Sequence, residues 1–588
     1  MVAGYLIPLR NLTLLRNKSS ILYCPLNIIN RQYSVRNVHR ANFRRNSSTS
    51  SDALKKGKWP IFLGLSLAGG GFAAYLLGKS SQEKKSGSEQ EDEEPLYVHE
   101  HLAEDLALLS DFGPVPYLLV GAGSASFAAY RAIRTRDPTA KILIVGEEPF
   151  VPYMRPPLSK EMWFDEKADG AKSLSFSQWN GKNRSLFYEP EEYFFSIREL
   201  LDSKNGGVSI IRGKKVVKVD ATQQTIHLDS GEKISYAKCL LATGSRPKNL
   251  EAFEGPSLKK HVTLYRNIRD FQKLDAVSKK AKKVAVIGGG LLGSELAVGL
   301  AHRVKGLDVV QVFPEKGIMG KILPEYLGEW TTEKVREEGV KVIPNTEVKS
   351  AKRNEDKVTL HLSNGKTLEV DHVIVAVGAE PDTEIAKASK LEIDDKHGGF
   401  LVNTEMEARK NLWVAGDAAC FYDPNLGRRR VEHHDQAIVT GKLAGGNMAG
   451  DNNPYLHQSM FWSDLGPTVG FEAIGIIDAA LPTVGVFAKT TPVTDIGLPV
   501  AESVEKVATE TKEEEVLRSP NPSDKYNKGV VFYLRDDIIV GIVLWNVFSK
   551  MQVARQIVNE AKSFEDITEV AKLFELHAQP EEEEDLLK

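Results

Sequence analysis

Two copies of a glycine-rich strand–turn–helix pattern constrain this chain more than any other feature of its sequence. The first copy follows an apolar run and reads Gly121-x-Gly123-x-x-Ser126, and the second follows the run KKVAVI and reads Gly288-x-Gly290-x-x-Gly. Glycines at these positions allow a tight turn and let the backbone approach a pyrophosphate at the positive end of a helix dipole. One such pattern is weak, but two complete ones predict an α/β protein with two Rossmann-like dinucleotide-binding domains.

Acidic residues follow the second strand of each predicted domain. Glu147 and Glu148 end the run KILIVGEE, with Glu147 26 residues after Gly121, and Glu315 ends the run VVQVFPE. A carboxylate at this place binds ribose hydroxyls in Rossmann domains. Because it would repel a 2′-phosphate, Glu315 predicts NAD(H) rather than NADP(H) in the second domain. The alternative for Glu315 is an ordinary exposed carboxylate at the end of a strand.

Three later apolar runs, residues 239–247, 372–383 and 412–420, also end in small residues and glycine. The third run leads into Gly416-Asp417 and small residues that predict the start of a helix. This order is similar to that of the glutathione-reductase-like flavoproteins, in which the aspartate of the GD pair hydrogen-bonds the ribityl chain of FAD. The similarity implies an NAD-binding domain, 245–379, inserted into a FAD-binding domain made of residues 111–244 and 380–459.

The remaining residues, 460–588, predict a C-terminal α+β domain. The run GVVFYLRDDIIVGIVLWN alternates apolar and polar residues as a hairpin does, and helical spacing follows it. Residues 501–528 are charged and interrupted by proline, which predicts a mobile surface loop.

The N-terminal segment has a different character from the rest of the chain. The first 51 residues hold eight Arg or Lys and no Asp or Glu, which is typical of a mitochondrial transit peptide, here 1–53, although a disordered basic tail is the alternative. Residues 60–78 carry no charge and as a helix would span about 28 Å, so they predict one transmembrane helix. A peripheral or cleaved segment is the alternative, because glycines interrupt it. Residues 79–94 predict an acidic linker. The charges on either side of the predicted membrane span indicate that the large C-terminal body faces the intermembrane space.

Charge and cysteine content exclude several classes of protein. Residues 95–588 hold 62 Lys and Arg against 72 Asp and Glu, a net charge of −10, so the average field of this body does not attract a polyanion. Basic clusters remain at residues 279–283 and 428–430. The three cysteines lie far apart in the sequence, which argues against a disulfide framework, a zinc site and a dithiol redox centre, and no metal site is predicted.

Longer runs extend the similarity to a narrower group. The runs VPYMRPPLSKEMWF, FPEKGIMGKILPEYL, RRVEHHDQA and HQSMFWSDLGP resemble the apoptosis-inducing-factor family of mitochondrial flavoproteins, and the resemblance covers nearly all residues after 95. It implies FAD contacts from Gly121, Ala122, Gly123, Ser124, Ala125, Glu147, Glu148, Arg155, Lys160, Val216, Arg266, Asp417, His433 and His434. It implies NAD(H) contacts from Gly288, Gly289, Gly290, Leu291, Leu292, Glu295, Glu315, Lys321, Gly378, Glu432, His433, Trp462 and Glu472, with Trp179 at a second nicotinamide site.

The resemblance also implies which residues are catalytic: Lys160, Glu295 and His433. Lys160 is expected at the isoalloxazine edge near N5, with Glu295 as its partner, and Arg155 is expected to neutralise pyrophosphate charge. A cation beside N5 stabilises the charge that develops as hydride arrives. An ordinary lysine–glutamate ion pair is the alternative. Trp462 is expected to stack on nicotinamide and Glu472 to accept from its carboxamide, although most tryptophans are core residues.

Three functions follow as expectations from the resemblance. The first is slow NADH oxidation with hydride transfer to FAD, a reduced charge-transfer complex and redox-linked homodimerisation. The second is an interaction role, in which the protein binds a small import oxidoreductase of the intermembrane space and supports respiratory-complex biogenesis. After release it would take part in caspase-independent apoptosis, enter the nucleus and bind DNA. The net charge predicts that this DNA binding is weak. The third is electron transfer like that of ferredoxin and rubredoxin reductases, which the membrane anchor and the C-terminal region disfavour.

Overall fold

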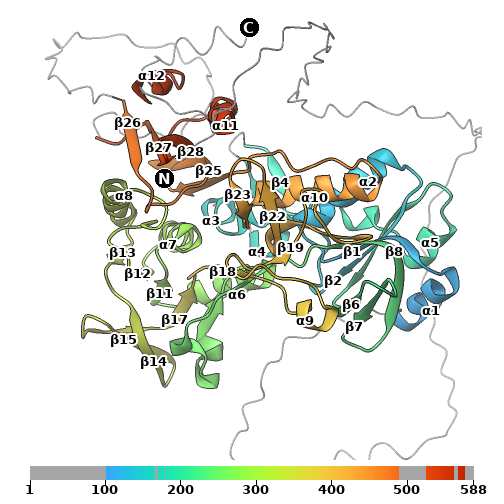
Figure 1. Ribbon diagram of the computed structural model, residues 1–588. Helices are drawn as coiled ribbons and strands as arrows, with labels where there is room; N and C mark the ends of the chain where they lie inside the picture. Colours follow the sequence, from blue (N-terminus) through green and yellow to red (C-terminus); the bar gives the residue numbers. More distant parts are fainter. Residues whose placement is uncertain (1–100, 166–169, 179–180, 489–524, 562–566, 577–588) are drawn as a thin grey trace, which may run out of the picture. The chain divides into compact units, whose positions relative to one another are not determined.

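The computed structural model describes residues 101–165, 170–178, 181–488, 525–561 and 567–576 (Figure 1). The chain divides by contacts into Met1–Glu91 and Asp92–Lys588, and all described residues belong to the second unit. The predicted transit peptide, membrane span and acidic linker, Trp179, and residues 501–524 of the predicted loop lie outside the described residues. Within the described ranges, no helix has the length and apolar character needed to cross a membrane.

The first sheet contains the first glycine-rich turn. Its parallel strands run in the order β21 (Leu412–Val414), β8 (Lys233–Leu241), β1 (Val115–Val120), β2 (Lys141–Gly146) and β5 (Gly207–Arg212). At one edge β20 (Glu407–Arg409) is antiparallel, while β6 (Val216–Asp220) and β7 (Thr225–Leu228) continue from β8 as an antiparallel meander. The central strands are apolar and almost wholly buried, as parallel strands covered on both faces must be.

Two helices pack closely beside this sheet and hold the first glycine-rich turn in place. The turn leads into α2 (Ser124–Arg136), which lies against α10 (His434–Met448). A Cβ on Gly441 would lie 2.2 Å from the carbonyl oxygen of Ala125, and one on Gly445 would lie 2.4 Å from that of Ala129. Only glycine allows this approach of the two backbones, so α2 is fixed along its length.

The second sheet contains the second glycine-rich turn and comes from residues between β8 and β21. Its parallel strands run in the order β10 (Val262–Leu264), β17 (His372–Val375), β11 (Lys283–Ile287), β12 (Asp308–Val312) and β13 (Lys341–Ile343). Its helices are α6 (Ile268–Ser278), α7 (Leu291–Arg303) and α8 (Glu325–Glu337). A three-stranded antiparallel sheet joins β14 (Val348–Asn354), β15 (Lys357–Leu362) and β16 (Thr367–Val370), and β9 (Ser245–Pro247) pairs with β18 (Ala379–Pro381).

The C-terminal sheet (orange and red in Figure 1) is antiparallel and includes the predicted hairpin. Its order is β24 (Met460–Leu465), β25 (Val469–Gly475), β28 (Ile538–Trp545), β27 (Gly529–Arg535) and β26 (Thr483–Phe487). The helices α11 (Met551–Glu560) and α12 (Ile567–Lys572) follow, as helical spacing predicted. This sheet packs on α8 and the segment before it: Tyr533 donates a 2.6 Å hydrogen bond to the carbonyl oxygen of Ile322, and the rings of Trp330 and Trp545 lie 6.0 Å apart.

The predicted helix after Gly416 is wrong. Gly416–Ala418 forms one 3-10 turn, and the chain continues as β22 (Ala419–Asp423) between β19 (Phe400–Leu401) and β23 (Gly427–Arg429). The small residues allowed a helix, but pairing with both neighbouring strands decided the conformation. The shorter elements are α1 (Leu102–Phe112), η1 (Pro156–Leu158), α3 (Glu161–Phe164), α4 (Gly170–Ser173), β3 (Ser175–Ser177), β4 (Asn183–Ser185), η2 (Glu191–Tyr193), α5 (Ile197–Asp202), η3 (Glu251–Phe253), η4 (Pro256–His261) and α9 (Ala386–Ser389).

Candidate active site

A cavity of about 760 Å³ extends from the first glycine-rich turn to the start of α7 and to β24. Most of the residues singled out in the sequence line it. They are Gly121, Ala122, Gly123, Ser124, Ala125, Glu147, Glu148, Arg155, Lys160, Val216, Arg266, Leu291, Leu292, Glu295, Asp417, Glu432, His433, His434 and Trp462. Gly288, Gly289, Gly290, Glu315, Lys321, Gly378 and Glu472 do not line it.

The first glycine of each fingerprint has the same geometry. Gly121 has φ +102° and Gly288 has φ +123°, a region that favours glycine. A Cβ on Gly121 would lie 2.2 Å from the carbonyl oxygen of Ala242, and a Cβ on Gly288 would lie 2.2 Å from that of Ala376. Each glycine-rich turn is therefore pressed against the end of a neighbouring strand, and no other residue fits without a shift of the backbone.

The two turns are stabilised by different side chains. Ser126, at the third position of the first fingerprint, donates a 2.5 Å hydrogen bond from Oγ to the carbonyl oxygen of Gly121. In the second turn the buried Gln311 of β12 donates from Nε2 to the carbonyl oxygen of Gly288 at 3.0 Å and to Ser294 Oγ at 3.1 Å. The departure at Ser126 thus adds a hydrogen bond, and Gln311 supplies the corresponding contact from a strand that the motif does not include.

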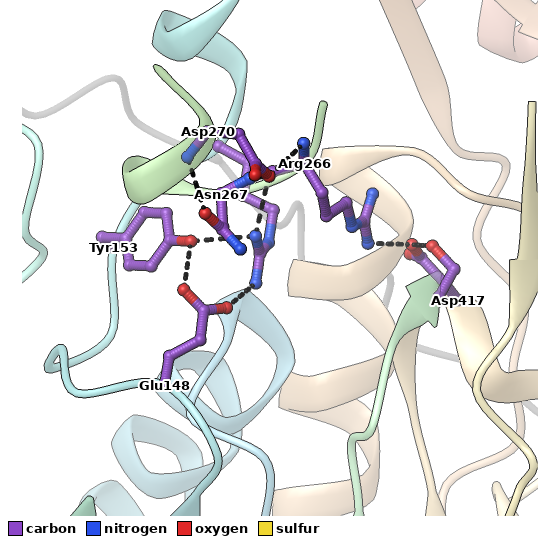
Figure 2. A network of polar contacts seen from close by, with 8 residues as sticks. Glu148, Tyr153, Arg266, Asn267, Asp270 and Asp417 are labelled. Atoms are coloured by element: carbon purple, nitrogen blue, oxygen red, sulfur yellow. Dashed lines mark hydrogen bonds and ion pairs between the residues drawn. The ribbon is translucent and has the colours of Figure 1, made fainter. Parts of the chain in front are cut away.

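A polar network lies beside the first turn (Figure 2). Arg155 donates to Glu148 Oε1 at 2.6 Å and to the hydroxyl oxygen of Tyr153 at 2.8 Å, and Tyr153 donates to Glu148 Oε2 at 2.7 Å. Although burial raises the pKa of Glu148, Arg155 beside it brings that pKa below its ordinary value. The Arg155 guanidinium is therefore held as a cation in the cavity wall, in a fixed orientation.

A second arginine contacts the GD turn. Arg266 donates from Nη2 to Asp417 Oδ2 at 2.9 Å, and Ser245 donates to the same oxygen at 2.7 Å. The Nε of Arg266 is buried and, among the described residues, has no hydrogen-bond partner. A buried donor without a partner is costly, so this cavity wall fits a polar or anionic ligand group. The donors at Arg266 and Arg155, the acceptor carboxylate at Asp417 and the open glycine-rich turn together fit FAD.

The structure brings Lys160 and Glu295 together. Lys160 Nζ lies 2.8 Å from Glu295 Oε2, and the two residues are 8% and 3% exposed. Ser159 also donates to Oε2, at 2.7 Å, and Ser463 of β24 donates to Oε1 at 2.7 Å. Lys160 Nζ also lies 5.9 Å from the ring centroid of Trp462, within the range of a cation–π interaction. Neither serine was singled out from the sequence, because no spacing rule connects them with Glu295.

Aromatic rings form the neighbouring wall. The His433 ring stacks on Phe461 with centroids 4.2 Å apart, and His434 meets Trp462 edge-on at 6.2 Å. Burial lowers the pKa of His433 to about 4 and also lowers that of His434. Both rings are therefore neutral at physiological pH, and His433 acts as a polar, uncharged group.

The acidic residue predicted at the end of β12 lies near a predicted cation. Glu315 Oε1 lies 3.5 Å from Lys321 Nζ, and the two side chains are 23% and 85% exposed. The Met319 amide donates a 2.6 Å hydrogen bond to the carbonyl oxygen of Gly289, which connects this segment to the second turn. Glu472, expected near nicotinamide, lies opposite Trp462 in the pairing of β24 with β25.

The two basic clusters make internal contacts. Lys279 pairs with Asp275 at 2.6 Å, and Lys283 lies 3.2 Å from Asp308. In the second cluster, Arg428 donates to the carbonyl oxygen of Val402 at 2.7 Å, Arg429 pairs with Asp423 at 3.3 Å, and Arg430 pairs with Glu432 at 2.6 Å. These contacts reduce the positive charge that either cluster offers to a ligand. The described residues contain no group of His, Cys, Asp and Glu suited to a metal ion.

Comparisons with known proteins agree with this arrangement. Residues 115–441 match the model of the pyridine nucleotide-disulphide oxidoreductase family, and residues 444–560 match the C-terminal domain of the mitochondrion-associated apoptosis-inducing factors. A relative named mitochondrial apoptosis-inducing factor 1 from Dictyostelium discoideum is 38% identical over 78% of this chain and 81% of its own length. A relative named putative mitochondrial apoptosis-inducing factor 1, from Drosophila melanogaster, is 48% identical over 79% of this chain, and the match spans 66% of that relative, just under two thirds.

A solved structure shares the fold at low identity. The covalent putidaredoxin reductase–putidaredoxin complex superposes with a TM-score of 0.62 and 19% identity, covering 78% of this chain and 96% of that one. At this identity the likeness concerns the fold alone.

Proposed function

Because the chain belongs to the pyridine nucleotide-disulphide oxidoreductase family and carries the C-terminal domain of the apoptosis-inducing factors, we propose that it transfers hydride from NADH to bound FAD. It is a FAD- and NAD(H)-dependent oxidoreductase of the apoptosis-inducing-factor type. The chain has no closely spaced cysteine pair, so reduction of a disulfide is not part of this proposal.

One observation carries the proposal: the buried Lys160–Glu295 ion pair in the cavity wall. Glu295 belongs to α7, which begins at the second glycine-rich turn, and the same cavity contains the first turn. FAD, when bound, supplies the acceptor for the two electrons of NADH. Lys160 keeps a positive charge where negative charge develops, and Glu295 keeps that lysine in place. Arg155 offsets the charge of the pyrophosphate, and Trp462 shields the pair from water.

Anaerobic titration of residues 95–588 with NADH tests the proposed function. We expect the purified protein to show a flavin absorption spectrum, to lose that absorbance in proportion to added NADH, and to develop a long-wavelength band. A protein without flavin, or one that dithionite reduces but NADH does not, contradicts the proposal. Rapid NADH-dependent reduction of ferredoxin or rubredoxin by the same sample would instead favour the electron-transfer alternative.

Glu315 is expected to make the protein selective for NADH. Its carboxylate, three residues beyond the end of β12 at Val312, would oppose the 2′-phosphate of NADPH, and the cost of bringing like charges together predicts flavin reduction about a hundredfold faster with NADH. Stopped-flow reduction with each nucleotide measures the ratio. Glu315→Gln should lower the ratio of the NADH rate to the NADPH rate. Glu325→Gln on α8 is the control, because it makes the same change at another position. Equal rates with NADH and NADPH in the unmodified protein would remove Glu315 from this role.

We also propose where the protein acts. Residues 1–53 would direct it to mitochondria and residues 60–78 would anchor it in the inner membrane with the body in the intermembrane space; the names of both relatives include mitochondria. There it would form a homodimer on reduction and bind a small import oxidoreductase. Apoptotic release into the cytosol and nucleus is the further role that the family implies. Protease treatment of mitochondria with and without a ruptured outer membrane tests the placement of the body.

DNA binding by residues 95–588 is expected to be weak. The net charge is −10, and the described basic clusters are partly neutralised by Asp275, Asp308, Asp423 and Glu432. The remaining contacts to phosphate would be few, and salt weakens such contacts steeply. Mobility-shift titrations at several salt concentrations should show binding that disappears near physiological ionic strength. Tight binding at that ionic strength would show that the folded surface separates its charges far more than these contacts indicate.

A further inference from the structure

One buried carboxylate connects three parts of the folded chain. Both oxygens of Glu295 on α7 accept hydrogen bonds: Oε2 from Lys160 and Ser159, which lie just before α3, and Oε1 from Ser463 on β24. Ser463 is 0% exposed and Glu295 is 3% exposed. Helix α7 thus supplies the carboxylate, the segment just before α3 supplies the lysine, and strand β24 of the C-terminal sheet supplies a hydroxyl that donates to the other carboxylate oxygen.

Strand β24 contacts the ion pair at two successive residues. Trp462 lines the cavity, and its ring centroid lies 5.9 Å from Lys160 Nζ. Successive residues of a strand point to opposite sides, and the next residue, Ser463, reaches Glu295 Oε1 at 2.7 Å. The position of one strand therefore bears on the lysine through its ring contact and on the carboxylate through a hydrogen bond.

We propose that Ser463 is a positioning residue for hydride transfer: it fixes the plane of the Glu295 carboxylate and thereby the place of Lys160. A carboxylate with one free oxygen can rotate about its last bond, because such terminal torsions are broad, and a flexible lysine held by it would move with it. This rests on the proposed role of Lys160 beside the flavin.

The first test measures the chemical reactivity of Lys160 directly and does not depend on catalytic turnover. In the FAD-loaded protein, Ser463→Ala should raise the acylation rate of Lys160, measured by mass spectrometry, by about tenfold, the equivalent of one lost hydrogen bond to a charged group. Ser459→Ala is the matched control, because it removes a hydroxyl on the same segment that donates to Gln436 instead. Ser463→Thr, which keeps the hydroxyl, should restore protection. Unchanged labelling in Ser463→Ala overturns the proposal.

The second test separates this proposal from the proposed function by a double-mutant cycle. Ser463→Ala should slow the limiting rate of flavin reduction by about tenfold with little change in the NADH concentration for half-maximal rate. In a Lys160→Ala background it should have no further effect. If Lys160→Ala slows flavin reduction and Ser463→Ala does not, the proposed function is supported and the role of Ser463 is refuted. An equal effect of Ser463→Ala in both backgrounds also refutes it. If neither substitution changes the rate, the roles of both Lys160 and Ser463 are refuted, while reduction of the flavin by NADH still supports the proposed function.

Discussion

Lys160→Ala is expected to slow the reduction of bound FAD by NADH by about a hundredfold or more, the usual cost of removing one preorganised charge-stabilising group. Lys160 is 8% exposed and lies 2.8 Å from Glu295, so its charge lies in a wall with little water to replace it. Stopped-flow absorbance under anaerobic conditions gives the limiting rate. The variant must bind as much FAD per protein as the unmodified protein, because only then does a slower rate reflect the loss of the lysine.

The matched control is Lys442→Ala, the same change at an exposed position of α10. Because Lys160→Ala leaves the buried Glu295 without its cation, we expect it to lower stability as well. The double variant Lys160→Met with Glu295→Gln removes both charges at similar volume, and it should fold normally and remain slow. Full FAD occupancy with an unchanged reduction rate in either variant would exclude Lys160 from the mechanism.

Substitution of the two equivalent fingerprint glycines should separate the two nucleotides. A Cβ at either Gly121 or Gly288 would lie 2.2 Å from a backbone carbonyl oxygen, at a φ that disfavours L-residues. Gly121→Ala should therefore yield protein largely without flavin. Gly288→Ala should keep FAD, but NADH should reduce that FAD at least about a hundredfold more slowly. Even a misplacement of a bound reactant by about 1 Å can slow a reaction that much.

Absorbance spectra of the purified variants measure flavin content, and dithionite provides a reductant that needs no nucleotide site. Dithionite should reduce Gly288→Ala as fast as the unmodified protein, which locates the defect in NADH binding. Normal reduction of Gly288→Ala by NADH would contradict the assignment of the second turn.

The stretches that could be predicted from the sequence are those in which local pattern and tertiary environment agree. Apolar runs became buried strands, and the alternating run near the C-terminus became the hairpin β27–β28. The segment after Gly416 was predicted wrongly because small residues permit both a helix and an extended strand. There, pairing with β19 and β23 decided the conformation. β23 follows β22 directly as the second strand of a hairpin, but β19 lies too far back in the sequence to be read from a local window.

The sequence by itself determined the residues whose role depends on spacing along the chain. The two fingerprints and Glu315 are such cases, because a tight turn and the end of the next strand fall at regular intervals from one another. Lys160 and Glu295 were paired through a family resemblance, not through spacing, since 135 positions separate them.

Only the tertiary structure decided which groups of the site contact one another, and it alone added the hydroxyl of Ser463 and the amide of Gln311. Ser463 reaches Glu295 across 168 positions, and Arg266 reaches Asp417 across 151. Gln311 stabilises the second turn from a strand, whereas Ser126 stabilises the first from its own helix. Such hydrogen bonds act over about 3 Å and require burial on both sides, so they exist only after the sheets and helices have packed.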